Sequence, residues 1–346
     1  MELDIMNRDI LAAQWKAGEL QILDEDALPL YLLRTRNVEH WLEIRAIDSH
    51  RAHSRLLKKA LRLEEKDDVS TVLSVNGANI TDSYWVKAPD STLRYRDVRF
   101  DHNYFARLSL TGNYSSFNRA ASIRNSRTPE LTNIGSFEKC WKLVDGQWWM
   151  YKKANHNEQF SELFAYHLGS ALGMNMAEYQ RCDDHCIMTR DFTGGASVNY
   201  EPAYSFIEDN EDYIETVEAL KKLCPEAVPD YVRMIYLDTL IANPDRHPFN
   251  FGILRNAESG KITGLAPNFD NNLALISRGY PGNVKRRNDL LAELLNTLLV
   301  YDADLRKHLP ELTEAMVREV IGTLNMKVRS QVIIDFVMNA FRQIER

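Results

Sequence analysis

The chain has 346 residues, of which 45% are hydrophobic and 26% are charged. This composition is that of a soluble globular protein, and the length exceeds one ordinary compact core, so we expect two or three domains. The formal net charge of −7 argues against broad electrostatic binding to nucleic acid or to acidic membranes. No apolar run approaches the roughly 20 residues that a membrane-spanning helix needs, and the N-terminus lacks the pattern of a secretory signal. These features predict a cytoplasmic protein that contacts neither membranes nor nucleic acid directly.

Cysteine is rare in the chain, which contains only Cys140, Cys182, Cys186 and Cys224. A chain of this length with so few cysteines does not need disulfides, so we expect none. Cys182, His185 and Cys186 lie close enough in sequence to suggest one corner of a zinc site. Structural zinc takes four ligands, and no second ligand pair follows at a suitable spacing. We therefore do not predict zinc.

Residues 1–130 are predicted to form an α/β accessory region. Apolar residues recur at helical spacing between residues 38 and 63 and predict a helix. Three short strands are predicted, at residues 69–75, 84–86 and 93–98. Residues 112–132 are rich in Ser, Asn, Thr and Arg and predict a surface loop or linker, with a segment that accepts phosphate as the alternative. No motif in this region carries recognisable chemistry.

Residues 131–195 are predicted to form a small β-rich domain. A short strand leads to Gly135, and a helix over residues 158–172 ends at Gly173. Four further strands are predicted, at residues 140–144, 148–152, 176–179 and 185–190. The first two flank an Asp-Gly turn, which is a strong signal for a β-hairpin. A small sheet with one inserted helix has the outline of the N-lobe of a kinase.

Residues 196–346 are predicted to be mostly helical. Five amphipathic helices are expected, at residues 212–223, 230–242, 284–299, 313–324 and 329–344. The exception is a β-hairpin with strands at 251–255 and 261–265, because a Glu-Ser-Gly turn joins them. The predicted fold class is therefore α+β, with parts at 1–130, 131–195 and 196–346.

The loop after the helix predicted at 230–242 carries the clearest chemistry. Pro244 ends that helix, because a proline disfavours helix in the residue before it. The chain then presents Asp245, His247 and Asn250 before a strand begins. Phosphoryl transfer needs a carboxylate to orient and deprotonate the attacking hydroxyl, and the protein-kinase catalytic loop places a metal-binding Asn five residues after that Asp. Asn250 follows Asp245 by five residues, so the spacing predicts a phosphoryl-transfer site.

A second carboxylate, Asp270, follows the predicted hairpin at 251–265. Kinases hold the metal that bridges the phosphates with an Asp beyond the catalytic loop. Hard oxygen ligands on two loops suit Mg²⁺, which keeps waters and phosphate oxygens as its other ligands. Asn250 and Asp270 are therefore the predicted metal ligands. The alternative is a pair of polar turns that flank a hairpin.

Residues upstream of this loop are candidates for the phosphate-binding part of the site. Lys152 and Lys153 end a predicted strand, and Glu162 lies on the next helix, in the order in which kinases place their phosphate-binding Lys and its Glu partner. Side chains alternate along a strand, so only one lysine can face a nucleotide, and we prefer Lys152. The alternative is two lysines at a frayed strand end with Glu162 on an exposed helix face. Gly135 would let backbone N–H groups approach phosphate, although a single glycine is a weak signal.

Four segments together resemble one known family. They read N-P-D-R-H-P-F-N at 243–250, P-N-F-D at 267–270, N-I-G-S-F-E-K at 133–139, and S-E-L-F-A-Y-H-L with a later G-M at 161–174. In these segments the chain resembles the HipA-like Ser/Thr kinases, which are the toxin kinases of bacterial toxin–antitoxin modules. The resemblance covers about residues 131–300 and is compatible with the helical tail. It implies a two-lobed protein-kinase-like fold, the cofactors ATP and Mg²⁺, and phosphorylation of Ser or Thr in a protein substrate.

Carried over by position, the resemblance assigns a role to each matching residue. It implies Asp245 as the catalytic base, with His247 supporting the geometry of the catalytic loop. It implies Asn250 and Asp270 as metal ligands and Lys152 as the phosphate-binding lysine. The implied hinge beside adenine consists of Thr189, Arg190, Asp191 and Phe192.

The family also has a serine in its Gly-rich loop whose autophosphorylation closes the site. The matching position is Thr132, with Ser136 nearby, so both are candidate autophosphorylation sites. Residues 1–130 do not obviously match the family's accessory domain and show no helix-turn-helix. We therefore expect any contact with DNA to come through a partner, such as a small antitoxin. The sequence does not identify the protein substrate.

The predicted function is an ATP- and Mg²⁺-dependent Ser/Thr protein kinase that acts as a toxin-like growth regulator. A lipid or small-molecule kinase is one alternative, because phosphoinositide-type kinases share this Asp–Asn spacing and the later Asp. The acidic net charge counts against it. A nucleotide-binding regulator without turnover is the other alternative, and the presence of every expected ligand counts against it.

Overall fold

The computed structural model describes residues 1–113, 127–183, 185–280 and 290–344. The chain divides into two compact units, and each is described by itself. Unit 1 comprises Met1–Lys153, Met188–Glu201 and Leu254–Thr263. Unit 2 comprises Ala154–Ile187, Pro202–Ile253 and Gly264–Arg346. The three-part division at residues 130 and 195 stays a prediction.

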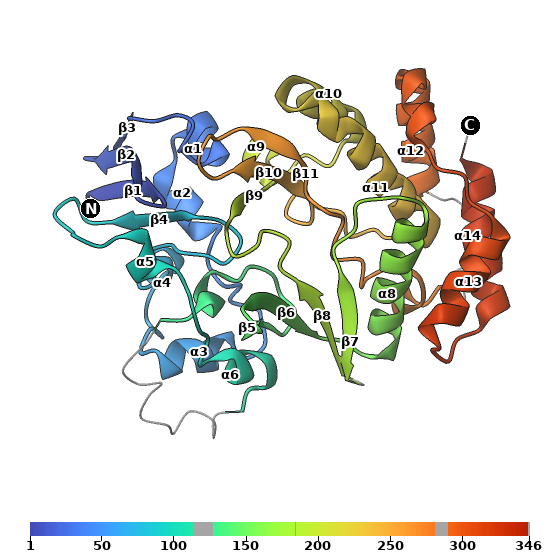
Figure 1. The fold of residues 1–346 in the computed structure, drawn as a ribbon, viewed down its shortest axis with the longest axis horizontal. Coiled ribbons are helices and arrows are strands. Elements are labelled where there is room, and N and C mark those ends of the chain that lie inside the picture. The colour runs from blue at the N-terminus through green and yellow to red at the C-terminus, as the bar shows by residue number, and fades with distance from the viewer. Residues whose placement is uncertain (114–126, 184, 281–289, 345–346) are drawn as a thin grey trace. The chain divides into compact units, whose positions relative to one another are not determined.

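The described residues form helices and three sheets, which confirms the predicted α+β class (Figure 1). The strand orders are β3-β2-β1-β4, β5-β6-β8-β7 and β11-β10-β9. Among the described residues, no helix is both long enough and apolar enough to cross a bilayer.

The first sheet lies in the accessory region of unit 1 and was largely missed from the sequence. Its strands are β1 (Leu3–Asn7), β2 (Ile10–Lys16), β3 (Glu19–Ile22) and β4 (Tyr84–Lys87). β1 pairs antiparallel with β2 and with β4, and all five of its residues are buried. Two of these buried residues are polar, so the segment does not show the apolar pattern by which a buried strand is predicted from sequence. Asp4 accepts a hydrogen bond from Gln14 (3.0 Å), and Asn7 accepts one from Ser83 (2.7 Å), so both are satisfied.

Six short helices complete the described part of the accessory region. They are α1 (Leu30–Thr35), α2 (Val38–Glu43), α3 (Ser54–Ala60), α4 (Asp68–Leu73), α5 (Tyr95–Val98) and α6 (Ala106–Thr111). The helix predicted over 38–63 is wrong as one element, because the structure divides it into α2 and α3. The strand predicted at 84–86 is confirmed as β4.

Two strands predicted in this region, at 69–75 and 93–98, are wrong, because α4 and α5 lie there. The β-branched residues of the first segment suggested a strand. Asp67 decides otherwise, because its side chain accepts from the backbone N–H of Ser70 (2.7 Å) and caps the start of α4.

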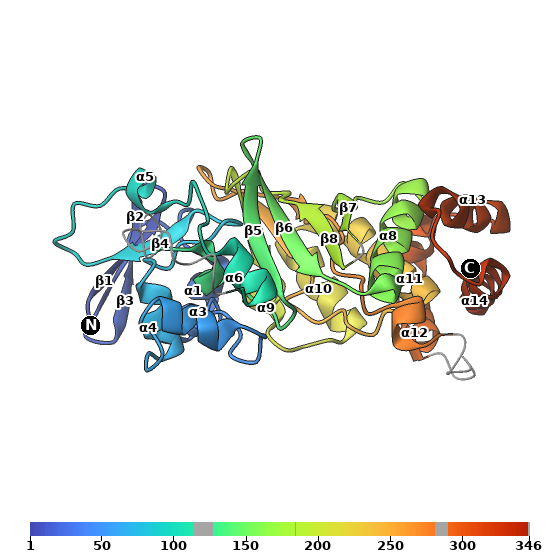
Figure 2. The same cartoon turned by 90° about the horizontal axis from the view of Figure 1, so that it is seen from below.

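A β-hairpin in unit 1 is formed by β5 (Lys139–Val144) and β6 (Gln147–Lys153), as predicted. Its turn residues Asp145 (φ 49°) and Gly146 (φ 77°) both have the positive φ that a type I′ turn requires. Figure 2 shows α6 beside β5. The strand predicted before Gly135 is wrong, because a 3₁₀ helix, η2 (Pro129–Thr132), lies there. Proline at the first position, with Thr128 as N-cap, favours that helix.

The next elements are α8 (His156–Ala171), β7 (Tyr179–Asp183), β8 (Cys186–Arg190) and β9 (Val198–Pro202). α8 begins two residues before its predicted start, because Asn155 and Glu158 form a capping box. The strand predicted at 176–179 is wrong for most of its length, since Met176 forms only an isolated bridge with Asn268. The strand predicted at 185–190 is confirmed as β8, and β9 was not predicted.

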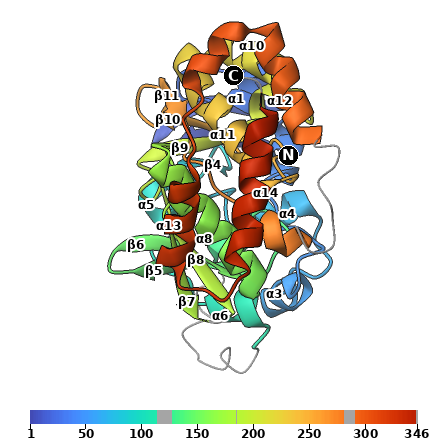
Figure 3. The same ribbon diagram turned by 90° about the vertical axis from the view of Figure 1, so that its right-hand side faces the viewer.

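Besides α8, the described residues of unit 2 contain the five expected helices and one, α9, that was not predicted. They are α9 (Tyr204–Ile207), α10 (Tyr213–Leu223), α11 (Val228–Ile241), α12 (Leu290–Tyr301), α13 (Glu314–Leu324) and α14 (Ser330–Gln343). The five predicted amphipathic helices are confirmed as α10 to α14, although residues 284–289 of the third lie outside the described residues. α12 and α14 pack against α11, and α13 packs against α8 and α14 (Figure 3). The predicted hairpin is confirmed as β10 (Gly252–Asn256) and β11 (Ile262–Leu265).

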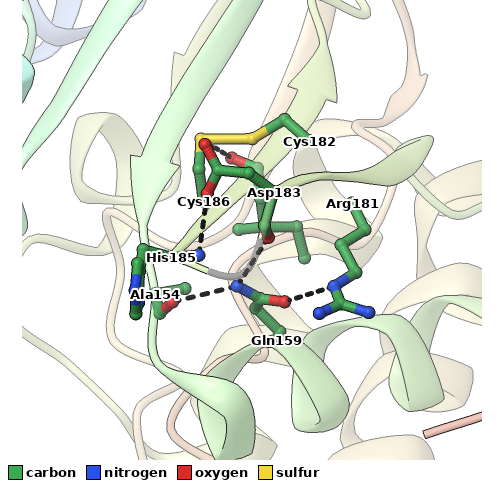
Figure 4. The surroundings of a disulfide bond; sticks show 8 residues. Ala154, Gln159, Arg181, Cys182, Asp183, His185 and Cys186 are labelled. Carbon is green, nitrogen blue, oxygen red and sulfur yellow. Dashed lines mark hydrogen bonds between the residues drawn. A yellow bond between two sulfur atoms is a disulfide. The ribbon is translucent and has the colours of Figure 1, made fainter.

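A disulfide joins Cys182 of β7 to Cys186 of β8, so the expectation of no disulfide is wrong (Figure 4). The two thiols suggested as part of a zinc corner are instead bonded to each other. Gln159 of α8 supports the turn between β7 and β8, because its amide donates to the carbonyl of Asp183 (3.1 Å) and accepts from Arg181 (2.9 Å). The other two cysteines are free and buried.

Candidate active site

The loop at 243–250 follows α11 directly, and α11 fixes its start. Ala242 has left-handed backbone geometry and ends the helix. Asn243 then donates from its backbone N–H to the carbonyl of Asp238 (2.9 Å) and from its side chain to the Asp238 carboxylate (2.9 Å). The Asn243 side-chain oxygen accepts from the N–H of Asp245 (3.2 Å). The position of Asp245 is therefore set by a fully buried carboxylate on α11.

Arg246 is the centre of this loop, and the sequence did not single it out. Its side chain is 4% exposed and donates to Asp238 through Nε (2.9 Å) and Nη2 (3.0 Å). Its other hydrogen bonds go to Asn250 O (2.7 Å), Phe269 O (2.8 Å), Asn268 Oδ1 (2.9 Å) and Asn271 Oδ1 (2.8 Å). Burial lowers the pKa of Arg246, but the charge and hydrogen bonds of Asp238, together with the charges of Asp270 and Glu162, raise it overall. One cation thus joins the 243–250 loop to the 268–271 segment.

Asp245 and Asn250 lie in direct contact. The Asn250 side-chain N–H₂ donates to the Asp245 carbonyl (2.8 Å) and lies 3.4 Å from its carboxylate. Because that nitrogen faces Asp245, the Asn250 side-chain oxygen points away and can accept a ligand. Asp245 is half-buried. Burial raises the pKa of its carboxyl, and the charge of Asp270 raises it further, against His247 and Arg246.

Asp270 is held from two sides within unit 2. Its backbone has a left-handed φ of 61°, and its N–H donates to the hydroxyl of Tyr179 on β7 (3.0 Å). The next residue, Asn271, donates from its backbone to the carboxylate of Glu162 on α8 (2.8 Å). Glu162 is fully buried. In unit 2, therefore, Glu162 positions the residue that follows Asp270, a role not predicted from the sequence.

The site supplies oxygen atoms that fit a divalent cation. The carboxylates of Asp245 and Asp270 are near enough for one to raise the pKa of the other, so a cation between the two loops would relieve their repulsion. Asn250 adds an amide oxygen. Carboxylate and amide oxygens without sulfur or imidazole suit Mg²⁺.

His247 supports the backbone of the same loop. Its ring Nδ1 accepts from the N–H of Phe249 (3.2 Å), and its carbonyl accepts from the N–H of Asn250 (2.8 Å). Phe249 stacks on Tyr204 of α9, with ring centroids 4.6 Å apart. The structure thus brings together Asp245, His247, Asn250, Asp270 and Glu162 in unit 2.

The remaining predicted site residues belong to unit 1. Lys152 is 7% exposed, whereas the Lys153 side chain is 56% exposed and pairs with Glu138 (3.1 Å). Lys152 is therefore the lysine of the pair that faces the interior. Its partner across the hairpin is Lys139, which is also buried. Whether Lys152 serves as the partner of Glu162 stays a prediction.

The two candidate autophosphorylation sites differ in exposure. Thr132 is 1% exposed, and its hydroxyl donates to the carbonyl of Ala78 (2.7 Å). Ser136 is exposed. Between them, Gly135 has a φ of 104°, which side-chain-bearing residues rarely adopt.

The expected adenine hinge at 189–192 lies at the end of β8. The Asp191 side chain is buried and accepts from Thr193 (2.9 and 2.7 Å) and from the N–H of Gly195 (2.6 Å). Burial raises the pKa of the Asp191 carboxyl despite these bonds. Because its side chain stabilises the turn that follows, any contact of Asp191 with a ligand would use its backbone.

The family model described as the HipA-like C-terminal domain matches residues 132–330, which is more than half of the chain. The chain belongs to the HipA-like family. None of the curated proteins compared with it matches.

Two solved structures of HipA-like and kinase proteins are similar to the chain. One is the toxin–antitoxin system HipA, HipB and operator DNA complex of Shewanella oneidensis MR-1, with a TM-score of 0.57 and 10% identity over 97% of both chains. The other is the proinflammatory kinase CtkA of Helicobacter pylori, with a TM-score of 0.45 and 16% identity over 60% of this chain and 90% of that one. The Shewanella match shows the kinase-like fold. It also corrects the expectation that residues 1–130 lie outside the resemblance, because it covers nearly the whole chain.

Three contributors to this HipA-like site were missed from the sequence: Arg246, Asp238 and Tyr179. Arg246 looked like one more polar residue of a loop, and its partners lie 4 to 25 residues away. Asp238 gave a usable signal, because it lies on a mostly apolar stretch of the helix, and a carboxylate in such a place is seldom buried without a partner. No local signal pointed to Tyr179, since only the fold brings its hydroxyl to Asp270.

Proposed function

We propose that the chain is an ATP- and Mg²⁺-dependent kinase that transfers the γ-phosphoryl group of ATP to a Ser or Thr hydroxyl of a protein. The observation that carries the proposal is the grouping of Asp245, Asn250 and Asp270 around the buried Arg246 in unit 2. The family supports a kinase, and the geometry supports phosphoryl transfer in particular.

In the proposed reaction, Asp245 is the base. Its carboxylate accepts the proton of the substrate hydroxyl while that oxygen bonds to the γ-phosphorus of ATP. The bond between the γ-phosphorus and the bridging oxygen breaks, and ADP leaves with that electron pair. Burial, the main cause of the raised pKa of Asp245, favours acceptance of a proton by its carboxylate. Asn250 donates to Asp245 and so orients the carboxylate.

Asn250 and Asp270 would hold Mg²⁺, which when bound neutralises charge on the phosphates. Arg246 keeps both residues in place by bonding the carbonyls of Asn250 and Phe269. Lys152 would supply the cation for the phosphates, the 133–139 loop would bind them through backbone N–H groups, and residues 189–192 would bind adenine.

Regulation is proposed through the same loop and through a partner. Ser136 is the better autophosphorylation candidate, because Thr132 is buried and hydrogen-bonded. The Shewanella neighbour was solved with HipB and operator DNA, which supports a small antitoxin partner for this chain, with any DNA contact made through that partner. We propose a cytoplasmic toxin-like growth regulator.

The test is phosphate transfer by the purified chain. Wild type and Asp245→Asn are incubated with labelled Mg-ATP and a bacterial lysate, and Ser/Thr phosphopeptides are identified by mass spectrometry. We expect label on protein hydroxyls with wild type alone. Equal labelling by both proteins would refute Asp245 as base. Nucleotide binding without any transfer would instead favour a regulator without turnover.

A further inference from the structure

Arg51 lies between α2 and α3, in the accessory region where the sequence showed no chemistry. It is 2% exposed. Its Nε donates to the carbonyl of Gly135 (2.8 Å), and its Nη2 donates to the carbonyl of Asn133. A single buried guanidinium thus holds two carbonyls of the 133–139 loop, and all of these residues belong to unit 1.

Glu130 faces Arg51 from the other side, at an ion-pair distance that is too long for a hydrogen bond. Its carboxylate is fully buried and lies 4.0 Å from Arg51 Nη1. It accepts from the N–H of Trp141 (2.7 Å) and from the side chains of Asn103 (2.6 Å) and Asn133 (3.0 Å). Because so many donors meet at this carboxylate, Glu130 is held in one position. Its charge in turn stabilises the buried Arg51.

Peptide geometry determines what these contacts do to the loop. In a planar trans peptide the C=O and the following N–H point in opposite directions. With the carbonyls of Asn133 and Gly135 directed at Arg51, the N–H groups of Ile134 and Ser136 point away from it. Neither N–H donates to any residue that the structure describes. Ile134 and Ser136 are both exposed.

Backbone N–H groups that point outward from a turn, as those of Ile134 and Ser136 do on either side of Gly135, form concavities that bind anions such as phosphate. Lys139 adds positive charge beside the loop, because a Cβ on Gly135 would lie 2.5 Å from the Lys139 ammonium. The loop therefore has outward donors, a nearby cation and a backbone held from behind.

We propose that Arg51 is a positioning residue for the nucleotide: by fixing the carbonyls of Asn133 and Gly135, it turns the N–H groups of Ile134 and Ser136 toward the phosphates of ATP. The accessory region is then part of the phosphate site. This inference rests on the proposed function, because it takes ATP as the ligand of the loop.

The test compares Arg51→Lys with Arg45→Lys in the full chain. Lysine keeps the charge but cannot donate to two carbonyls in the arginine geometry. Arg45 is a matched control, since it is also buried and bonds a carbonyl (Gly77, 2.8 Å) and a carboxylate (Asp82, 2.9 Å), but it contacts no residue of the loop.

Calorimetric titration with Mg-ATP and with adenosine supplies the readout. We expect Arg51→Lys to weaken Mg-ATP binding about tenfold and to change adenosine binding by less than about twofold, because only the phosphates contact the loop. Arg45→Lys should leave both affinities near wild type. A purely structural role for Arg51 would weaken ATP and adenosine equally or not at all, and either result would overturn the inference.

Amide hydrogen exchange of the wild type provides an independent check that needs no variant. Mg-ATP should protect the amides of Ile134 and Ser136, whereas adenosine should not. If ATP binds and those amides remain unprotected, the inference is wrong while the proposed function stands. If the wild type binds no ATP, the proposed function fails first.

Discussion

Two loops of this protein are each organised by a buried arginine, one in each unit. Arg246 bonds the carbonyls of Asn250 and Phe269, and Arg51 bonds those of Asn133 and Gly135. Each arginine lies near a fully buried carboxylate. The two sites therefore use the same device, a guanidinium that fixes backbone carbonyls.

The two arginines differ in how closely the neighbouring carboxylate approaches them. Asp238 bonds Arg246 directly at 2.9 Å and raises its pKa, whereas Glu130 lies 4.0 Å from Arg51, and burial lowers the pKa of Arg51 to about 10. Charge is thus well compensated in the 243–250 loop and less so beside the 133–139 loop. The comparison predicts that substitutions near Arg246 lower kcat and the free energy of unfolding, whereas substitutions near Arg51 lower the affinity for the nucleotide.

The largest expected effect is that of Asp245→Asn. Loss of the base should lower kcat by about 10²–10⁴-fold, with little change in Mg-ATP affinity, because Asp245 acts on the hydroxyl. Steady-state phosphorylation and calorimetry measure the two quantities. Asp335→Asn, an exposed aspartate on α14, is the control and should behave as wild type. If Asp245→Asn keeps the kcat of the wild type, Asp245 is not the base, and the 243–250 loop has no catalytic role.

Arg246→Met should be the most destabilising change. It leaves Asp238 buried without its cation, which costs about 3–5 kcal/mol of unfolding free energy. Urea denaturation measures this. Arg233→Met removes a half-exposed partner of Asp230 on the same helix and should cost no more than about 1 kcal/mol. Similar losses for the two variants would show that Arg246 is not the anchor of its loop.

Gly135→Ala should raise the KM for ATP about tenfold with a smaller change in kcat, because a methyl group there displaces the Lys139 ammonium from its place beside the loop. Gly146→Ala is the matched control for Gly135→Ala. Gly146 also has a positive φ, but a Cβ added there would have no atom within 4 Å. Both should lose about 1–2 kcal/mol of stability from the left-handed backbone. Only Gly135→Ala should alter the KM. Equal KM values in the two variants would show that the 133–139 loop takes no part in nucleotide binding.

Tyr179→Phe should have the smallest effect. It removes the acceptor of the Asp270 N–H, and since Asp270 is half-buried, water can replace the hydroxyl in part. We expect kcat to fall about twofold to fivefold, equivalent to about 0.4–1 kcal/mol. Tyr236→Phe loses a comparable bond to Pro310 (3.0 Å) away from the loop and should keep full activity. A larger loss for Tyr236→Phe would mean that the readout reports stability alone.

Local patterns could be predicted from the sequence. The Asp245–Asn250 spacing, the turn at Asp145 and the amphipathic helices of unit 2 are all encoded within a few residues of where they act. The Asn155–Glu158 capping box was equally local and was overlooked. The strand assigned to 69–75 failed because β-branched residues outweighed the N-cap Asp67, which the structure shows to be decisive.

Long-range contacts could not be predicted in this way. Arg51 acts on a residue 82 positions away, and nothing near it in sequence marks that partner. β1 was missed because its buried Asp4 and Asn7 have partners outside their own strand. The position of Glu162 on its helix was predicted correctly, but its bond to Asn271 spans 109 positions and depends on the fold.

The burial of Thr132 makes its modification a question of local opening. A kinase cannot reach a hydroxyl that donates to the carbonyl of Ala78 unless the surrounding segment first detaches. Detachment also breaks the bond between Ile47 and Leu131 (2.9 Å). Free energies of such openings range from near zero to that of global unfolding. The rate of phosphate incorporation at Thr132 would therefore measure how often this segment leaves the accessory region, whereas incorporation at Ser136 would not depend on that event.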